Sequence, residues 1–282
     1  MNPHAWQLRD RTLTIGPRPL VMGIVNVTPD SFSDGGRWFN PNAAIAHAMT
    51  LVEQGADILD IGGESTRPGA DPVSVQEERE RVVPVVAELA RHTRVPISLD
   101  TMKAEVARAG LEAGAAIIND VSGLRDPAMI AVAKEYRAGV VVMHMPGDPT
   151  TMQDRAEYAD VVAEVTGYLQ ERLRTLGECG IPPEAVCLDP GIGFGKRTVH
   201  NLDLLANLGA VAALNRPVCL GVSRKGFIGR LCGRELAERD PGSLAIGCFA
   251  AARGTVHVLR VHNVPDARDA ALLLEAIDQH RR

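Results

Sequence analysis

Eight short runs rich in Val, Ile and Leu recur along the chain, and each is followed by an amphipathic stretch of helical length. This unit predicts parallel strands that alternate with helices, and eight units favour closure of the strands into a barrel. The competing doubly wound sheet usually has a glycine-rich phosphate-binding turn after its first strand, where this chain has NVTPDSFSDGG. The expected strands span residues 20–25, 58–61, 95–99, 115–118, 139–143, 185–188, 217–222 and 256–261.

We expect the barrel to form one domain. The prediction is an α/β protein, a single (β/α)8 TIM barrel over residues 1–282 with its core from about 18 to 280. Aromatic residues make up only 4% of the chain, so the core should be aliphatic, as in strands buried on both faces. Residues 6–16 alternate in polarity and end in Gly, which predicts a short β-hairpin that caps the N-terminal end of the barrel. The clearest helix candidates span 43–54, 74–91 and 267–280.

Charge, cysteine content and hydropathy exclude several classes of protein. The net charge is −5 and no block of Lys and Arg stands out, so nucleic acid is not an expected partner. No run of 18 apolar residues and no apolar leader occurs, so neither a membrane span nor export is expected. The five cysteines are odd in number and contain no CxxC pair, which indicates reduced structural thiols in a cytoplasmic protein.

Polar residues follow almost every expected strand. In a barrel, the carboxyl ends of the strands and the loops after them share one mouth, so residues far apart in sequence converge there. The sequence therefore predicts a ring of hydrogen-bonding groups, which comprises Asn26, Glu64, Asp100, Asn119, His144, Asp189, Ser223, Lys225 and His262.

Part of this ring is acidic or carries an amide. Asp100 ends SLD, Asn119 and Asp120 end IIND, and Asp189 follows CL. A carboxylate accepts two parallel hydrogen bonds, which suits a flat heterocycle with adjacent N–H donors. The alternative for each Asp is to cap the helix that follows it. Lys225 has two interpretations, as a donor to a ring carbonyl or as a surface residue.

A second part of the ring suits an anion. The loop GGESTRPG holds Thr66 and Arg67 between Gly and Pro residues, and Arg260 and His262 lie two residues apart on one face of the last strand. The alternatives are a solvated Arg67 and a salt-bridged strand end. The long loop NVTPDSFSDGG is typical of a lid, with a decorated turn as its alternative. His144 has no HxH or HExxH partner, so we expect a structural or wall-forming histidine there.

Eight motifs occur in order between about residues 20 and 265: NVTPDSFSDGG, DIGGESTRPG, SLDT, INDVSG, MHM, DPGIGFGK, GVSRKGFIG and RVHNV. Together they resemble the signature of the dihydropteroate synthase family. The resemblance implies a pterin-binding TIM-barrel transferase of folate biosynthesis. Such an enzyme condenses (7,8-dihydropterin-6-yl)methyl diphosphate with p-aminobenzoate to give 7,8-dihydropteroate and diphosphate. The resemblance also implies a homodimer that uses Mg2+ and is inhibited by sulfonamides.

The resemblance also assigns roles to individual residues. The implied pterin-binding residues are Asp100, Asn119, Met143, Asp189 and Lys225. The implied diphosphate-binding residues are Asn26, Thr66, Arg67, Arg260 and His262, with Asn26 as the Mg2+ ligand. The implied p-aminobenzoate-binding residues are Phe32, Thr66, Pro68, Phe194 and Ser223, and Asp34 shapes the same side. The implied catalytic set is Asn26, Asp34, Arg67, Lys225, Arg260 and His262. Two departures from the family pattern are Asn263 and Pro146.

The residue chemistry fits an ionising displacement, because the electron-rich pterin ring delocalises the cation that forms as diphosphate departs. The main catalytic task is then to stabilise charge on the leaving group. Two alternatives share parts of this pattern. A corrinoid methyltransferase of the pterin-binding barrels has no use for the STRPG and RVH anion cluster, and a non-catalytic pterin-binding homologue should have lost motif residues that are intact here.

Overall fold

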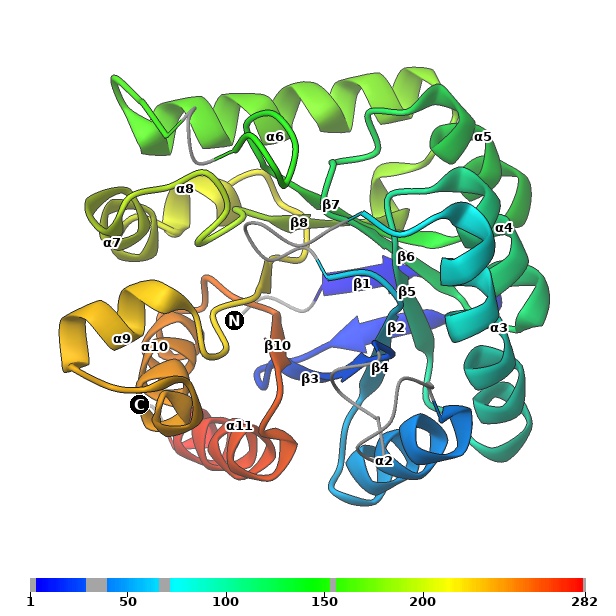
Figure 1. Cartoon of the computed structure of the whole chain (residues 1–282). Coiled ribbons are helices and arrows are strands. Elements are labelled where there is room, and N and C mark those ends of the chain that lie inside the picture. Colours follow the sequence, from blue (N-terminus) through cyan, green and yellow to red (C-terminus); the bar gives the residue numbers. More distant parts are fainter. Residues whose placement is uncertain (1–3, 29–39, 66–71, 153–155, 281–282) are drawn as a thin grey trace.

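The computed structural model of this chain describes residues 4–28, 40–65, 72–152 and 156–280 (Figure 1). The parallel strands are β3 (Leu20–Asn26), β4 (Ile58–Gly62), β5 (Ile97–Asp100), β6 (Ile117–Asp120), β7 (Gly139–Met143), β8 (Val186–Asp189), β9 (Cys219–Leu220) and β10 (Val258–Val261). They pair in the order β8-β7-β6-β5-β4-β3-β10-β9. A parallel bridge between Leu188 and Val218 joins the two ends of this order, so the predicted eight-stranded barrel is confirmed.

Helices surround the strands (Figure 1). Several begin at side chains that accept backbone N–H groups, such as Ser74, Asp126 and Asp160. Asn263 caps the last helix by accepting from Asp266 N, a role that Asn and Asp perform equally well. The helices are α2 (Pro41–Glu53), α3 (Val75–His92), α4 (Ala104–Ala113), α5 (Pro127–Tyr136), α6 (Val161–Glu178), α7 (Thr198–Ala206), α8 (Gly209–Ala212), α9 (Gly226–Cys232), α10 (Asp240–Ala252) and α11 (Val264–Gln279), with short 3-10 turns η1 (Pro183–Ala185) and η2 (Leu236–Glu238).

Alternate residues of each strand face opposite sides of the barrel wall. One set, which includes Leu99 and Val140, packs against the helices in the main core. The other set fills the interior of the barrel and comprises Met22, Ile58, Ile117, Val141, Cys187, Cys219 and Val258. Side chains two residues further along the same strands also point into the barrel, and they lie directly above this interior layer on the side of the carboxyl ends.

A hairpin closes the N-terminal end of the barrel, as predicted. It consists of β1 (His4–Gln7) and β2 (Thr12–Ile15), which pair antiparallel. Trp6 and Ile15 are fully buried in the same cluster as the interior layer. The indole nitrogen of Trp6 donates to Ala185 O at 2.9 Å, just before β8 begins. The open mouth is therefore at the carboxyl ends of the strands.

The strand boundaries differ from the predictions by a few residues. The strand expected over 217–222 is reduced to Cys219–Leu220, because Pro217 has no amide hydrogen and Val218 forms only an isolated bridge. All five cysteines are free thiols, as predicted. Among the described residues, no helix is both long and apolar enough to cross a membrane.

Candidate active site

Polar side chains from several strands meet directly above the interior layer of the barrel. Asp60 follows Ile58 by two residues, and the same spacing relates Asn119 to Ile117 and Asp189 to Cys187. Because the side-chain period of a strand is two, these groups point into the barrel at the next level toward the mouth. The side chains at this level include those of Asp60, Asp100, Asn119, Met143, Asp189 and Arg260.

Arg260 occupies the centre of the acidic part of this layer. Its Nε donates to Asp60 Oδ2 at 2.6 Å, and its Nη2 donates to Asp100 Oδ2 at 2.6 Å. Asn119 Nδ2 donates to the same oxygen of Asp60 at 3.0 Å. Arg260 was expected at the diphosphate, but here it is held by Asp100, a predicted pterin-binding residue, and by Asp60, which was not predicted. Sequence reasoning missed Asp60, although a carboxylate inside the apolar run ILDIG was a usable signal.

The acidic floor holds more negative charge than one guanidinium neutralises. Burial raises the pKa of Asp100 to about 7, and the negative charges of Asp60 and Glu78 add to the increase, although Arg260 opposes it. Asp60 is fully buried and, within the described part of the chain, its Oδ1 has no hydrogen-bond partner. The floor therefore retains acceptor capacity for a ligand that carries N–H donors.

Asp189 and Lys225 form the second half of the floor. Asp189 Oδ1 accepts from Gly191 N at 2.7 Å. Burial raises the pKa of Asp189, and the Lys225 charge opposes that increase. Burial lowers the pKa of Lys225 to about 8, and its Nζ donates to Ile192 O. Lys225 is partly buried and contacts Ile192 O and the Phe194 ring, and its role as a donor to a ring carbonyl stays a prediction.

Small and apolar groups lie beside these charges. A Cβ on Gly221 would lie 3.8 Å from Asp189 Oδ2 and 3.9 Å from Arg260 Cδ, so the glycine places no side chain between Asp189 and Arg260. Met143, Met145 and Met152 form a buried apolar cluster against which Phe194 packs. Lys225 Nζ lies 4.2 Å from the centroid of the Phe194 ring.

Ser223 and His262 meet nearer the mouth. Ser223 Oγ lies 2.8 Å from His262 Nδ1 and accepts from the backbone N–H of His262 at 3.2 Å. A hydroxyl that accepts this amide hydrogen can donate its own proton to Nδ1, and that tautomer makes Nε2 the donor. The structure thus joins two residues that were assigned to different substrates.

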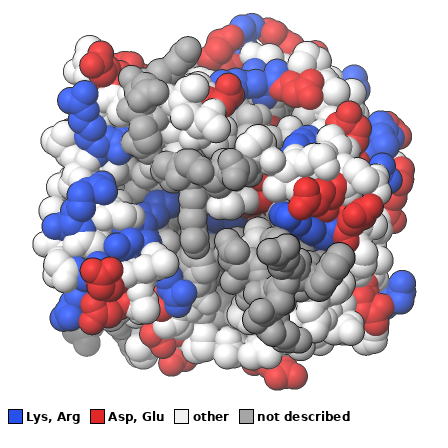
Figure 2. All heavy atoms as spheres, in the orientation of Figure 1, with Lys and Arg blue, Asp and Glu red and all other residues white. Residues whose placement is uncertain are grey.

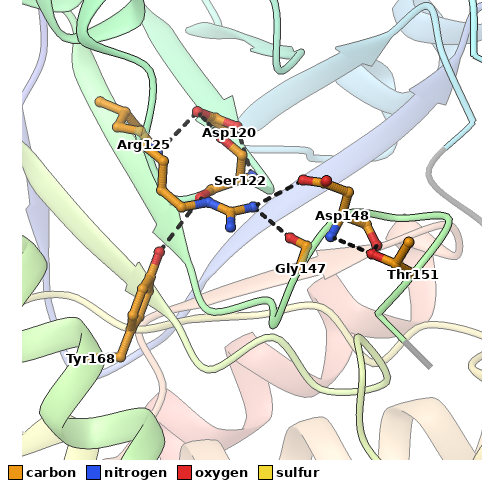
Figure 3. A network of polar contacts seen from close by, with 8 residues as sticks. Asp120, Ser122, Arg125, Gly147, Asp148, Thr151 and Tyr168 are labelled. Carbon is orange, nitrogen blue, oxygen red and sulfur yellow. Dashed lines mark hydrogen bonds and ion pairs between the residues drawn. The ribbon is translucent and has the colours of Figure 1, made fainter. Parts of the chain in front are cut away.

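Asp120 orders its own loop and does not cap the helix that follows it, because the N-cap of α5 is Asp126. It accepts from Ser122 N at 2.7 Å, from Ser122 Oγ at 2.8 Å and from Leu124 N at 2.9 Å (Figure 3). Arg125 donates to Ser122 O at 2.7 Å and to Gly147 O at 2.6 Å, which ties the loop after β6 to the loop after β7. Asp120 therefore shapes a loop, and the floor uses its neighbour Asn119.

Two buried networks were not predicted. His144, expected to be structural, lies 2.9 Å from the ammonium of Lys196, and burial with this charge lowers the pKa of His144 to about 3. Glu64 accepts from Val73 N at 2.8 Å and from Lys103 Nζ at 2.8 Å. Lys103 also donates to the buried Glu78 at 2.6 Å. The second network joins Glu64 to Val73, the residues near either end of the segment 66–71.

Several expected site residues lie outside the described residues, namely Phe32, Asp34, Thr66, Arg67 and Pro68. Asn26 is described, and it lies half-buried at the mouth end of β3, opposite Gly62. Within the described ranges, no group of three or more His, Cys, Asp or Glu side chains forms a metal site. Mg2+ commonly uses one or two protein oxygens together with substrate phosphates and water, so the amide of Asn26 is compatible with such an ion.

Charge on the molecular face drawn in Figure 2 is mixed. Lys and Arg side chains are interspersed with Asp and Glu side chains over this face. Attraction of an anionic substrate must therefore come from individually placed groups in the site.

The model of the pterin binding enzyme family matches residues 22–262. The dihydropteroate synthase of Escherichia coli (strain K12) is 47% identical over 258 residues, which cover 92% of this chain and 91% of the relative. The chain belongs to the dihydropteroate synthase family. The predicted enzyme, a dihydropteroate-forming transferase of folate biosynthesis, is confirmed by this membership, which favours it over the corrinoid methyltransferase and the non-catalytic homologue.

Solved structures of this family share the fold. Dihydropteroate synthase from Xanthomonas albilineans with 4-aminobenzoic acid has a TM-score of 0.92 and 48% identity, and the match covers 100% of both chains. The same enzyme with 7,8-dihydropteroate has a TM-score of 0.89 and 46% identity over 99% of this chain and 100% of that one. The Yersinia pestis enzyme with a sulfonamide drug complex has a TM-score of 0.91 and 41% identity over 98% and 99% of the two chains.

Proposed function

We propose that the floor of this barrel binds the pterin ring of (7,8-dihydropterin-6-yl)methyl diphosphate. The observation that carries the proposal is the buried layer in which carboxylates and an amide from several strands lie together, with no side chain at Gly221. Asp189 and Asp100 accept ring N–H groups, and Lys225 donates to the ring carbonyl. The proposed pterin-binding residues are Asp100, Asn119, Met143, Asp189 and Lys225, to which the structure adds Asp60 as support.

The diphosphate then lies toward the mouth. His262, with Nε2 as donor, is the described group best placed to receive it, and Arg260, bound to Asp60 and Asp100, is the described arginine of the proposed set. Asn26, Thr66 and Arg67 complete the proposed binding set. Mg2+ held by Asn26 would offset the negative charge of the leaving group. No enzyme nucleophile is required, because the C–O bond to diphosphate breaks first and the pterin ring delocalises the resulting cation.

The amine of p-aminobenzoate attacks the methylene carbon, a C–N bond forms, and the nitrogen loses a proton to water. Phe194 and Ser223 are the described residues on the proposed p-aminobenzoate side, together with Phe32, Asp34, Thr66 and Pro68. Sulfonamides, one of which the Yersinia pestis relative binds, should compete at this position.

A direct assay tests the proposal. Formation of 7,8-dihydropteroate should require both substrates, and the Asp189→Asn variant should lose affinity for the pterin about tenfold or more, because a charged hydrogen bond is worth about 1.5–3 kcal/mol. The matched control is Asp203→Asn, since Asp203 is exposed on α7. Unchanged pterin affinity in a folded Asp189→Asn protein would remove Asp189 from the site.

We also propose that two copies of the chain associate through α10 and α11. Large apolar side chains are exposed there, with Phe249 at 46%, Leu273 at 64% and Ile277 at 61% exposure. Leu273 and Ile277 lie one helical turn apart, so they form one apolar face. Sedimentation should show a dimer that Leu273→Glu dissociates, whereas a monomeric parent protein would contradict the proposal. The cytoplasmic location and the single domain over residues 1–282 stay predictions.

A further inference from the structure

Lys196 is a buried lysine that the proposed chemistry does not use. It follows β8 in the loop DPGIGFGK, and its side chain is only 3% exposed. Within the described ranges it forms no salt bridge. Instead, its Nζ lies 2.9 Å from Gly191 O, 3.0 Å from Phe194 O and 2.9 Å from His144 Nδ1. A fourth acceptor, His144 O, is farther away at 3.3 Å.

The three nearest acceptors match the three hydrogens of an ammonium group. His144 fits this arrangement because its pKa, lowered to about 3 by burial and by Lys196, keeps the ring neutral and able to accept at Nδ1. Burial and the charge of Lys225 lower the pKa of Lys196 to about 7, while the charge of Asp189 opposes this. The match of three hydrogens to three acceptors therefore applies to the protonated form of Lys196, which predominates below about pH 7.

The loop that Lys196 binds has an unusual backbone. Gly191, Gly193 and Gly195 have φ angles of +67°, +85° and +55°, so the carbonyls of this loop do not continue the strand ladder. A Cβ on Gly191 would lie 1.9 Å from His144 O, which shows how closely the loop packs on the loop after β7. Lys196 donates hydrogen bonds to two carbonyls of this loop, Gly191 O and Phe194 O, which in the described part of the chain have no partner on a neighbouring strand.

Two proposed site residues are attached to the same loop. Gly191 N donates to Asp189 Oδ1 at 2.7 Å, and Gly191 O accepts from Lys196. Phe194 O accepts from Lys196, and the Phe194 ring faces the ammonium of Lys225. Lys196 therefore hydrogen-bonds directly to Gly191, whose N–H orients the Asp189 carboxylate. It also hydrogen-bonds directly to the backbone carbonyl of Phe194.

We propose that Lys196 is a positioning residue that sets the orientation of Asp189 and Phe194 by binding the carbonyls of their shared loop. This inference rests on the proposed function, because Asp189 is taken to bind the pterin and Phe194 to flank p-aminobenzoate. It adds a residue that touches neither substrate and acts through hydrogen bonds to Gly191 and Phe194.

Lys196→Met tests the proposal, with Lys134→Met as the control because Lys134 is exposed on α5. The ligand is 6-hydroxymethylpterin, which lacks the diphosphate, and its affinity is measured by calorimetry. Lys196→Met should weaken it about tenfold and raise the KM for p-aminobenzoate, whereas affinity for inorganic pyrophosphate with Mg2+ should change less than twofold. If Lys196→Met does not fold, Lys196→Gln, which retains two N–H donors, takes its place.

Two further measurements separate positioning from general loss of structure. Lys196→Cys alkylated with 2-bromoethylamine restores an ammonium at nearly the original length and should recover pterin affinity, with alkylated parent protein as reference. Effects of Lys196→Met and Asp189→Asn should also be less than additive. Parent-level affinity in folded Lys196→Met, full additivity, or no recovery on alkylation would overturn the proposal. Failure of the parent protein itself to bind pterin would instead refute the proposed function.

Discussion

Arg260 on β10 and Asp60 on β4 meet across the intervening strand β3, with Nε of Arg260 2.6 Å from Oδ2 of Asp60. Asp60 is fully buried, and it also accepts from Asn119 at 3.0 Å. A buried ion pair of this kind is costly to break, because the remaining partner keeps its charge without compensation. Asp60 therefore holds two residues of the proposed pterin floor in place.

Asp60→Asn should lower affinity for 6-hydroxymethylpterin about tenfold, because Arg260 and Asn119 lose a charged acceptor worth about 1.5–3 kcal/mol. Asp57→Asn is the matched control, since Asp57 pairs with Arg18 at 2.8 Å at the opposite end of β4. Calorimetry and urea unfolding distinguish the two variants. We expect both to lose stability and only Asp60→Asn to lose pterin affinity, so equal loss of affinity would refute the proposed support role.

Arg260→Ala should shift the pH dependence of pterin binding. The Arg260 charge lowers the pKa of Asp100, which burial has raised to about 7, so its removal should raise that pKa further. More Asp100 is then protonated at pH 7, and affinity for 6-hydroxymethylpterin should fall there and recover at higher pH. Calorimetric titrations between pH 6 and 9 measure this midpoint, and Arg260→Lys controls for charge. A midpoint identical to that of the parent protein is the contrary result.

Ser223→Ala should reduce kcat/KM for the pterin diphosphate by about two- to tenfold, the range of one lost hydrogen bond. The hydroxyl of Ser223 lies 2.8 Å from His262 Nδ1, so its loss removes the group that fixes the proposed Nε2 donor. Affinity for the bare pterin should not change. Ser122→Ala is the control, because Ser122 donates an equally short hydrogen bond to Asp120, at 2.8 Å. Equal kinetic loss in both variants would contradict a specific role for Ser223.

Lys225→Met should flatten the dependence of stability on pH. Burial lowers the pKa of Lys225 from 10.5 to about 8, so between these values the unfolded chain binds more protons than the folded one. The free energy of unfolding therefore rises with pH in this window, and Lys225 contributes up to about 1.4 kcal/mol per pH unit. Urea unfolding from pH 7 to 10.5 should show a shallower slope in Lys225→Met than in the parent or in Lys134→Met. Parallel slopes in all three proteins would rule out a depressed pKa.

Much of the fold was predictable because its signals are local. The apolar runs and the amphipathic stretches after them have periods that a single segment displays without its neighbours. The polar residue after each run marked the mouth, and Asp100, Asn119 and Asp189 indeed face inward there. Asp60 was predictable in principle, because it lies two residues after Ile58 on the same strand and Ile58 points into the barrel.

The sequence by itself determined the order of strands and helices along the chain and the family signature. The alternation of residues along each strand also determined which side chains of the floor point into the barrel. Only the tertiary structure decided which polar side chains meet: Arg260 with Asp60 and Asp100, Ser223 with His262, and Lys196 with His144. It also decided that Asp120 turns to its own loop while Asn119 joins the floor. The physical reason is that such pairs depend on the stagger between strands and on the path of each loop, and both arise when the barrel closes rather than in any single segment.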